Sequence, residues 1–195
     1  MKKLVATFDV FFDWGGANDA AGNNTDVDAL GPPTLRFKDA DDATIDASDK
    51  IVIPAAGTKY SYWKHIYLKC SNADGHTMNN FAVYSDGGAW DVNNDLDIGD
   101  EQPTKNTGSD AGYEVADTDD EDMTADHAHV TGVTDFFSYT AGEGTDFDVS
   151  CSEAGAAVDA ANETTDYIVL EFKTVNAAVP GDLANETGTW SYDEA

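Results

Sequence analysis

Strict alternation of apolar and polar residues limits most strongly what this chain can fold into. In the opening segment, every second residue from Leu4 to Phe12 is apolar, so these side chains share one face of an extended chain. The segment 165–175 alternates in the same way through Ile168, Leu170 and Phe172. A surface helix would instead place apolar residues three and four positions apart. The alternation therefore predicts β-strands that each turn one face towards a core.

The same pattern recurs along the whole chain, with turn-forming sequences such as Gly31-Pro32-Pro33 and Pro180-Gly181 between the alternating segments. We predict about ten strands, near the following residues: Phe8, Phe37, Ile51, Ile66, Phe81, Tyr113, Phe137, Val149, Leu170 and Trp190. This succession predicts an all-β fold, an antiparallel β-sandwich or jelly roll with long acidic loops, in a single domain that spans residues 1–195.

Three segments lack a clear strand pattern. The acidic segments 91–109 and 116–129 are expected to form long loops, which in a compact sandwich often carry function or face a partner. The segment 152–162 is rich in alanine but contains Gly155, so one short helix and a plain loop both fit it.

Charge is the second constraint on the chain. It has 38 Asp and Glu against 10 Lys and Arg, which gives a formal net charge of −28. Like charges repel in a compact fold at low ionic strength, but in about 1 M salt the Debye length is roughly 3 Å and most of this repulsion disappears. An aromatic content of 11% argues against disorder. The composition resembles that of proteins from halophiles that accumulate salt, above all haloarchaea and their viruses; an acidic, calcium-rich extracellular protein is the alternative.

The same charge makes nucleic acids and anionic membrane surfaces unfavourable partners. The apolar runs are too short for a membrane-spanning helix, and the N-terminal apolar stretch ends early, at Asp9, so no secretory signal is predicted. There is no G-x-S-x-G, P-loop or G-x-G-x-x-G motif, and we expect no enzyme activity. Cys70 and Cys151 are expected to point inward, with a disulfide left open.

One candidate metal site lies in the second acidic segment. His127 and His129 are two positions apart, so on a strand both imidazoles would project from the same face. Asp126 or a carboxylate of the preceding acidic run could complete a site for a divalent ion. A solvated acidic loop with two half-exposed histidines is the alternative interpretation.

A second candidate lies in the first acidic segment. Asp91, Asn93 and Asp95 match the first three ligand positions of an EF-hand loop. The sixth position, which requires glycine, is Leu96, and the twelfth, which requires glutamate, is Gln102. A calcium or sodium site of another kind remains as the hypothesis. No cofactor is expected beyond such a structural divalent or monovalent cation.

Trp63, His65 and Tyr67 alternate on one face of the segment 60–70. An exposed row of this kind is a platform for a sugar ring, which would make the protein a glycan-binding surface module of a halophile. Packing of the three rings against another layer of the fold is the alternative.

Four stretches carry a resemblance to a known class of proteins: residues 35–46, 51–71, 78–88 and 180–195. They resemble virion structural proteins of tailed viruses that infect bacteria and archaea. Together with the acidic composition, the resemblance suggests a structural protein of a haloarchaeal tailed virus, which would be assembled in the host cytoplasm and reside in the virion at high salt. A capsid-surface decoration or turret protein is expected first, and a tail-tube, tail-tip or baseplate component is the alternative.

The resemblance implies assembly surfaces rather than a catalytic site. The expected partners are further copies of the chain, as a trimer or pentamer, other virion proteins and the host cell surface. Terminal strands can add to the sheet of a neighbour. The predicted assembly residues therefore lie in the two terminal strands: Phe8, Val10, Phe12, Trp190 and Tyr192.

Overall fold

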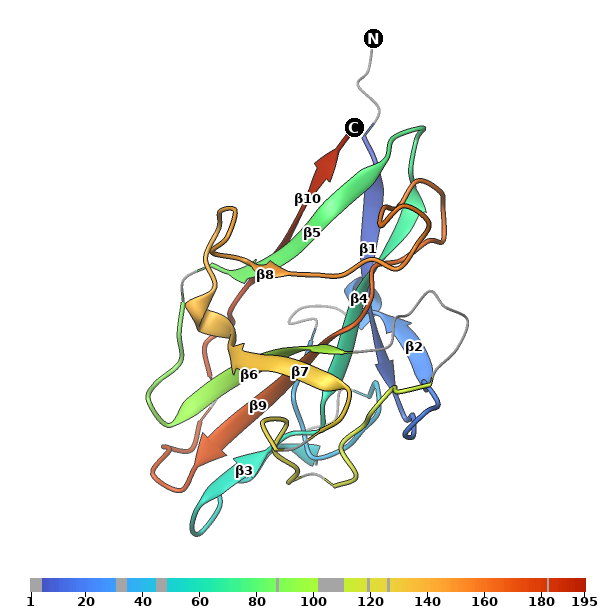
Figure 1. Ribbon diagram of the computed structural model, residues 1–195. Coiled ribbons are helices and arrows are strands. Elements are labelled where there is room, and N and C mark those ends of the chain that lie inside the picture. The colour runs from blue at the N-terminus through green and yellow to red at the C-terminus, as the bar shows by residue number, and fades with distance from the viewer. Residues whose placement is uncertain are drawn as a thin grey trace.

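The computed structural model describes residues 5–30, 35–44, 49–86, 88–101, 111–118, 120–125, 127–181 and 183–195 (Figure 1). A seven-stranded sheet has the order β2 (Asn23–Asp26), β1 (Thr7–Trp14), β4 (Lys64–Asn72), β9 (Ile168–Val175), β6 (Asn94–Glu101) and β7 (Val130–Asp135), with β3 (Thr58–Tyr60) also paired to β9. A second sheet has the order β10 (Gly188–Glu194), β5 (Met78–Ser85) and β8 (Phe147–Asp148). All strand pairs are antiparallel, which confirms the all-β sandwich.

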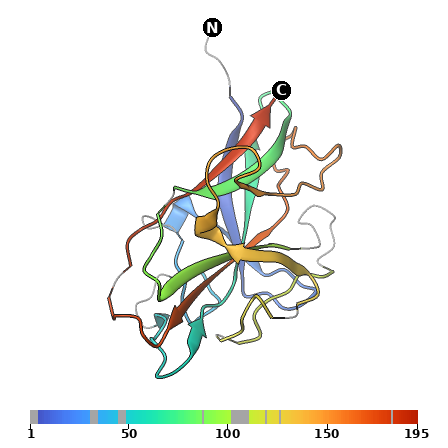
Figure 2. The ribbon, with the colours of Figure 1, turned by 60° about the vertical axis from the view of Figure 1, so that its left-hand side comes forward.

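The main core lies between the two sheets. Phe8 of β1 contacts Phe81 of β5 and Tyr192 of β10, with ring centroids 5.8 and 5.0 Å apart. From the larger sheet, Ile98 and Ile168 enter the same core and are 0% and 1% exposed. Turning the molecule shows β10 and β5 crossing in front of β1 (Figure 2). The face of the larger sheet that meets this core is called the inner face, and the opposite one the outer face.

The alternation identified the inner face correctly in the best-patterned strands. In β9, Ile168, Leu170 and Phe172 all belong to the core between the sheets. In β1, Phe8 and Phe12 contribute to it as predicted. The strand predicted at residues 188–194 is β10, paired to β5.

Other strand predictions were wrong. The segments at Phe37, Ile51 and Tyr113 are irregular, although all three side chains are at least half-buried. Residues 136–138 form a short 3-10 helix, η4 (Phe136–Ser138), because the Asp135 side chain accepts a hydrogen bond from the Phe137 N–H and closes a turn there.

The largest error concerns β6, which takes residues 94–101 of the segment 91–109 that was predicted to be an acidic loop. Leu96 and Ile98 point to the core, while Asp95 and Asp97 on the other face bind Lys173 of the neighbouring strand. The carboxylates that suggested a loop are thus paired inside a sheet.

The segment 152–162 is a loop without a helix, in which Gly155 and Ala156 have φ of 79° and 55°. Within the described ranges, no helix has the length and hydropathy to span a bilayer.

Candidate functional sites on the outer face of the larger sheet

The outer face of the larger sheet is covered by the described residues of 111–129, which we call the cover segment. Trp63, His65 and Tyr67 all lie beneath it and are each 2% exposed. The Trp63 indole N–H donates to the backbone oxygen of Glu121 in the cover, at 3.2 Å. The ring platform suggested by the sequence is therefore buried packing, and these three side chains present no open surface to a sugar.

Two buried carboxyl groups hold the cover segment to the sheet. Glu101 at the end of β6 accepts a hydrogen bond from the Glu114 N–H at 2.8 Å. Both carboxyl oxygens of Glu171 in β9 accept from the Met123 N–H, at 2.9 and 2.8 Å. Glu101 and Glu171 are 1% and 0% exposed. The cover has no strand of its own, so these contacts satisfy backbone groups that a sheet would otherwise pair.

Burial sets the protonation of this layer. It raises the pKa of both Glu101 and Glu171 to about 9, because a carboxylate is poorly solvated there. His65 donates from Nε2 to the Glu114 backbone oxygen at 2.7 Å and lies 3.5 Å from the Glu101 carboxyl. Burial lowers the pKa of His65 to about 3. Both partners are therefore neutral at pH 7, and their contact is polar rather than ionic.

A cluster of tyrosines continues this layer towards β1. The Tyr167 hydroxyl donates to the buried Asp13 carboxylate at 2.5 Å. The rings of Tyr113 and Tyr67 pack on Tyr167 with centroids 5.4 and 5.5 Å away. The nearby carboxylate and burial together raise the pKa of Tyr167. The cluster is thus an internal contact between two strands and the cover.

The predicted histidine metal site is only partly described. His127 packs edge-on against Trp63, with its Nε2 3.2 Å from the Asp122 backbone oxygen and 3.7 Å from the Glu121 carboxylate. His129 is exposed. Asp126 lies outside the described residues. Among the described residues, no group of three His, Cys, Asp or Glu side chains is arranged to hold a metal ion.

The EF-hand-like segment forms a turn into β6. The Asp91 carboxylate accepts hydrogen bonds from the Asn93 N–H at 2.8 Å and from the Asn94 side chain at 3.1 Å. Asp95 is 3.3 Å from the Lys173 ammonium group. The two carboxylates of this set, Asp91 and Asp95, therefore already have partners within the chain.

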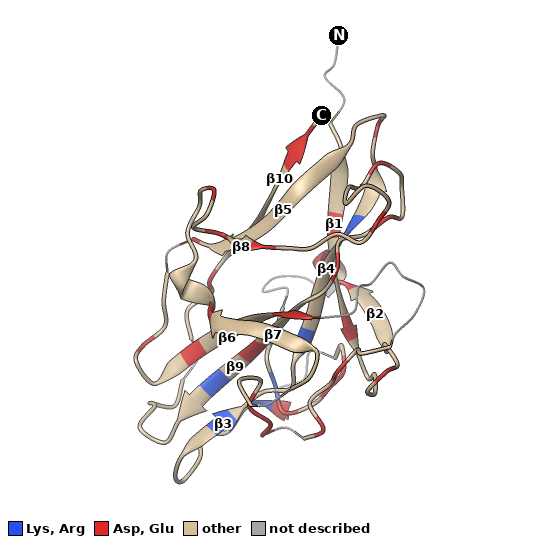
Figure 3. Ribbon diagram, in the orientation of Figure 1, with Lys and Arg blue, Asp and Glu red and all other residues tan. Residues whose placement is uncertain are grey.

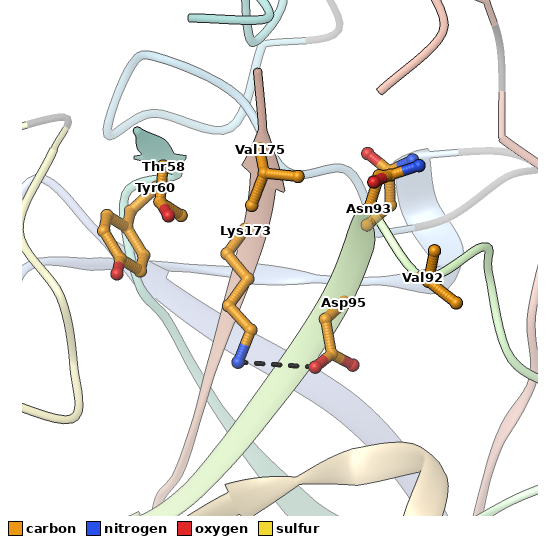
Figure 4. A pocket seen from close by; sticks show the side chains of 8 residues that line it. Thr58, Tyr60, Val92, Asn93, Asp95, Lys173 and Val175 are labelled. Carbon is orange, nitrogen blue, oxygen red and sulfur yellow. Dashed lines mark ion pairs between the residues drawn. The ribbon is translucent and has the colours of Figure 1, made fainter. Parts of the chain in front are cut away.

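A small groove opens on the outer face where the cover ends (Figure 4). Its volume is about 250 Å³. It is lined by residues of β3, β6, β9 and the turn before β6: Thr58, Tyr60, Val92, Asn93, Asn94, Asp95, Lys173 and Val175. Of these residues, Asn93 and Asp95 were candidates from the sequence, but as ligands of an ion rather than as the lining of a groove.

The predicted assembly residues line the main core at one end of the sandwich. Phe12 is 2% exposed, whereas Phe8, Val10, Trp190 and Tyr192 are half-buried against the core. Each therefore already contacts other parts of the chain. The half-buried ones leave part of each side chain at the surface beside β10.

The sequence did not reveal that several ionisable side chains are buried, Glu101, Glu171 and Lys64 among them. Lys64 is 1% exposed, with its ammonium group 5.3 Å from the centre of the Phe12 ring, and burial lowers its pKa to about 8. Alternation placed Glu171 on the face opposite Ile168, Leu170 and Phe172, with no sign that this face is buried as well. No pattern of residue spacing distinguishes these buried charged residues from exposed ones.

The two cysteines, Cys70 and Cys151, are free thiols, and burial raises the pKa of Cys151 to about 11.

Neither a family model, nor a curated protein, nor a solved structure matches this chain.

Proposed function

We propose that this chain is a non-enzymatic virion structural protein that assembles with copies of itself in concentrated salt, as a capsid-surface decoration or turret protein of a halophilic tailed virus. The observation that carries the proposal is the edge strand β10. Among the described residues, β10 pairs only with β5, so one side of its backbone is available to a further strand. Exposed strand edges readily accept a strand from another chain.

The chemistry of β10 supports assembly that depends on salt. Trp190 and Tyr192 are half-buried next to the free edge, while Asp193 and Glu194 are exposed at its end. At low ionic strength these carboxylates and the net charge of −28 oppose the approach of a second copy. Screening in molar salt removes that barrier, and the partly exposed rings can then be covered.

The direct test is the native mass of the purified protein by light scattering in about 2–3 M KCl, where screening is nearly complete. We expect a closed oligomer, a trimer or pentamer, that dissociates as salt is withdrawn. A hexameric ring would favour the alternative of a tail-tube, tail-tip or baseplate component. A monomer at every salt concentration would contradict the assembly proposal.

The salt requirement has its own test. The melting temperature should rise steeply between about 0.1 and 2 M KCl, because the acidic side chains repel one another less as the Debye length shortens. Figure 3 shows acidic residues in loops and strands over the whole molecule rather than in one patch. A flat melting temperature over this range would exclude the halophilic environment.

A further inference from the structure

The groove at the end of the cover segment is formed by side chains of three adjacent strands, β3, β9 and β6. The pairing of residues between these strands decides which side chains lie next to one another. Tyr60 of β3 lies opposite Lys173 of β9, which in turn lies opposite Asp95 of β6. Two positions along, Thr58 lies opposite Val175, and the Val175 N–H donates to the Asn93 backbone oxygen. The side chains therefore form two parallel rows across the outer face, as Figure 4 shows.

Most of the side chains that line the groove carry hydrogen-bonding groups, and only Val92 and Val175 are aliphatic. The Lys173 ammonium group donates to Asp95 at 3.3 Å and to Asp97 at 2.6 Å, and the Tyr60 hydroxyl donates to Asp122 at 2.8 Å. These contacts fix the positions of the polar groups. The side-chain amide of Asn93 makes no hydrogen bond to another described residue, so it has both a donor and an acceptor to offer.

We propose that this groove binds one pyranose ring of a neutral saccharide. Each sugar hydroxyl both donates and accepts, which suits the neighbouring ammonium, carboxylate and amide groups. Val175 and the Tyr60 ring offer apolar surface to the C–H face of the sugar. A volume of about 250 Å³ is smaller than a drug-sized pocket and suits a single ring.

Other classes of ligand fit this lining less well. A phosphate or other anion would meet the Asp95 carboxylate, and the charge of Lys173 is already shared by Asp95 and the buried Asp97. A metal ion would have to displace the Lys173 ammonium group from the same two carboxylates. An apolar ligand would cover polar groups without replacing their hydrogen bonds to water. The inference goes beyond the assembly role and does not depend on it, because the groove and β10 belong to different sheets.

The test is a titration with small saccharides that is monitored by the backbone amide NMR signals. It is done in about 2 M KCl, where the repulsion between the acidic side chains is screened. The probes are the methyl α-glycosides of glucose and galactose, methyl β-N-acetylglucosaminide and, as an anionic probe, glucuronate. At least one neutral glycoside should shift the amide signals of Asn93, Asp95 and Lys173 saturably, with a Kd in the low millimolar range expected of so small a ligand. Glucuronate should bind more weakly than the methyl α-glycoside of glucose.

A matched pair of variants assigns the binding to the groove. Asn93→Ala should weaken the best neutral glycoside about fivefold, by the loss of one or two hydrogen bonds. Asn185→Ala, an exposed asparagine outside the groove, should leave the Kd unchanged. The proposal is overturned if no neutral glycoside gives saturable shifts at the groove, if glucuronate binds more tightly than the methyl α-glycoside of glucose, or if Asn93→Ala binds as the unaltered protein does.

Discussion

The two faces of the larger sheet are buried to a similar extent but by different chemistry. Leu170 and Glu171 are neighbours in β9, and they are 7% and 0% exposed on opposite faces. The inner face packs apolar side chains against a second sheet. The outer face packs carboxyl groups, an imidazole and tyrosines against an irregular segment.

This difference shows that the extent of burial does not by itself identify the interactions that stabilise a face of the sheet. Apolar contacts on the inner face carry no charge, so their contribution does not change with pH. On the outer face, Glu101 and Glu171 are protonated in the folded state but ionised in the unfolded chain at neutral pH. The contribution of the outer face to the free energy of unfolding therefore decreases as the pH rises.

Removing apolar volume from the inner face should have the largest effect. Leu170→Ala should lower the free energy of unfolding by about 2–5 kcal/mol, because the side chain is lost from a packed core and leaves a cavity. Chemical denaturation at high salt measures this change. Val179→Ala, at a position that is 77% exposed, is the control and should change stability by less than about 0.5 kcal/mol. A loss below about 1 kcal/mol for Leu170→Ala would mean that the inner face is not the main core.

The pH dependence of stability should come from the outer face. Between about pH 7 and 8 the unfolded chain has already lost the protons that Glu101 and Glu171 keep when folded, so stability should fall as pH rises, by about 1.4 kcal/mol per unit for each of them. In this window the unfolded His65 is mostly neutral, as the folded one is, while the folded Lys64 begins to lose its proton towards its lowered pKa of about 8, which offsets part of the fall near pH 8.

Isosteric neutral variants isolate this contribution. Glu101→Gln and Glu171→Gln should each make the slope of unfolding free energy against pH shallower by about one proton, whatever their effect on absolute stability. Glu143→Gln, at an exposed position, should leave the slope unaltered. If neither buried variant changes the slope, neither carboxyl keeps its proton in the folded state at these pH values.

The sequence predicts the packing of the inner face much better than that of the outer face. Period-two alternation placed Ile168, Leu170 and Phe172 on the core side, because burial on one face is what alternation records. It gave no information on what covers Glu171, which lies on the opposite face. The cover that buries Glu171 has no periodicity of its own, and its contacts join residues 48 positions apart, so no local pattern predicts them.

The groove was hidden for a similar reason. Asn93 and Asp95 were recognised as a polar cluster, but their partners come from β3 and β9, which are distant in the sequence. Only the strand order brings Tyr60, Lys173 and Asp95 into one row. A chain with so many carboxylates also offers many apparent ligand sets by chance, and pairing with Lys173 separates this cluster from the others.

The smallest of the expected effects concerns the tyrosine cluster at the edge of the outer face. Tyr167→Phe removes the hydroxyl that donates to the buried Asp13 carboxylate but keeps the ring contacts with Tyr67 and Tyr113. The loss should be about 1–3 kcal/mol, since a buried carboxylate is left with one donor fewer. Tyr139→Phe, whose half-buried ring packs on Phe147, is the control for loss of a hydroxyl alone. Equal stability of Tyr167→Phe and the unaltered protein would show that the outer face, like the inner one, is held by packing rather than by its polar groups.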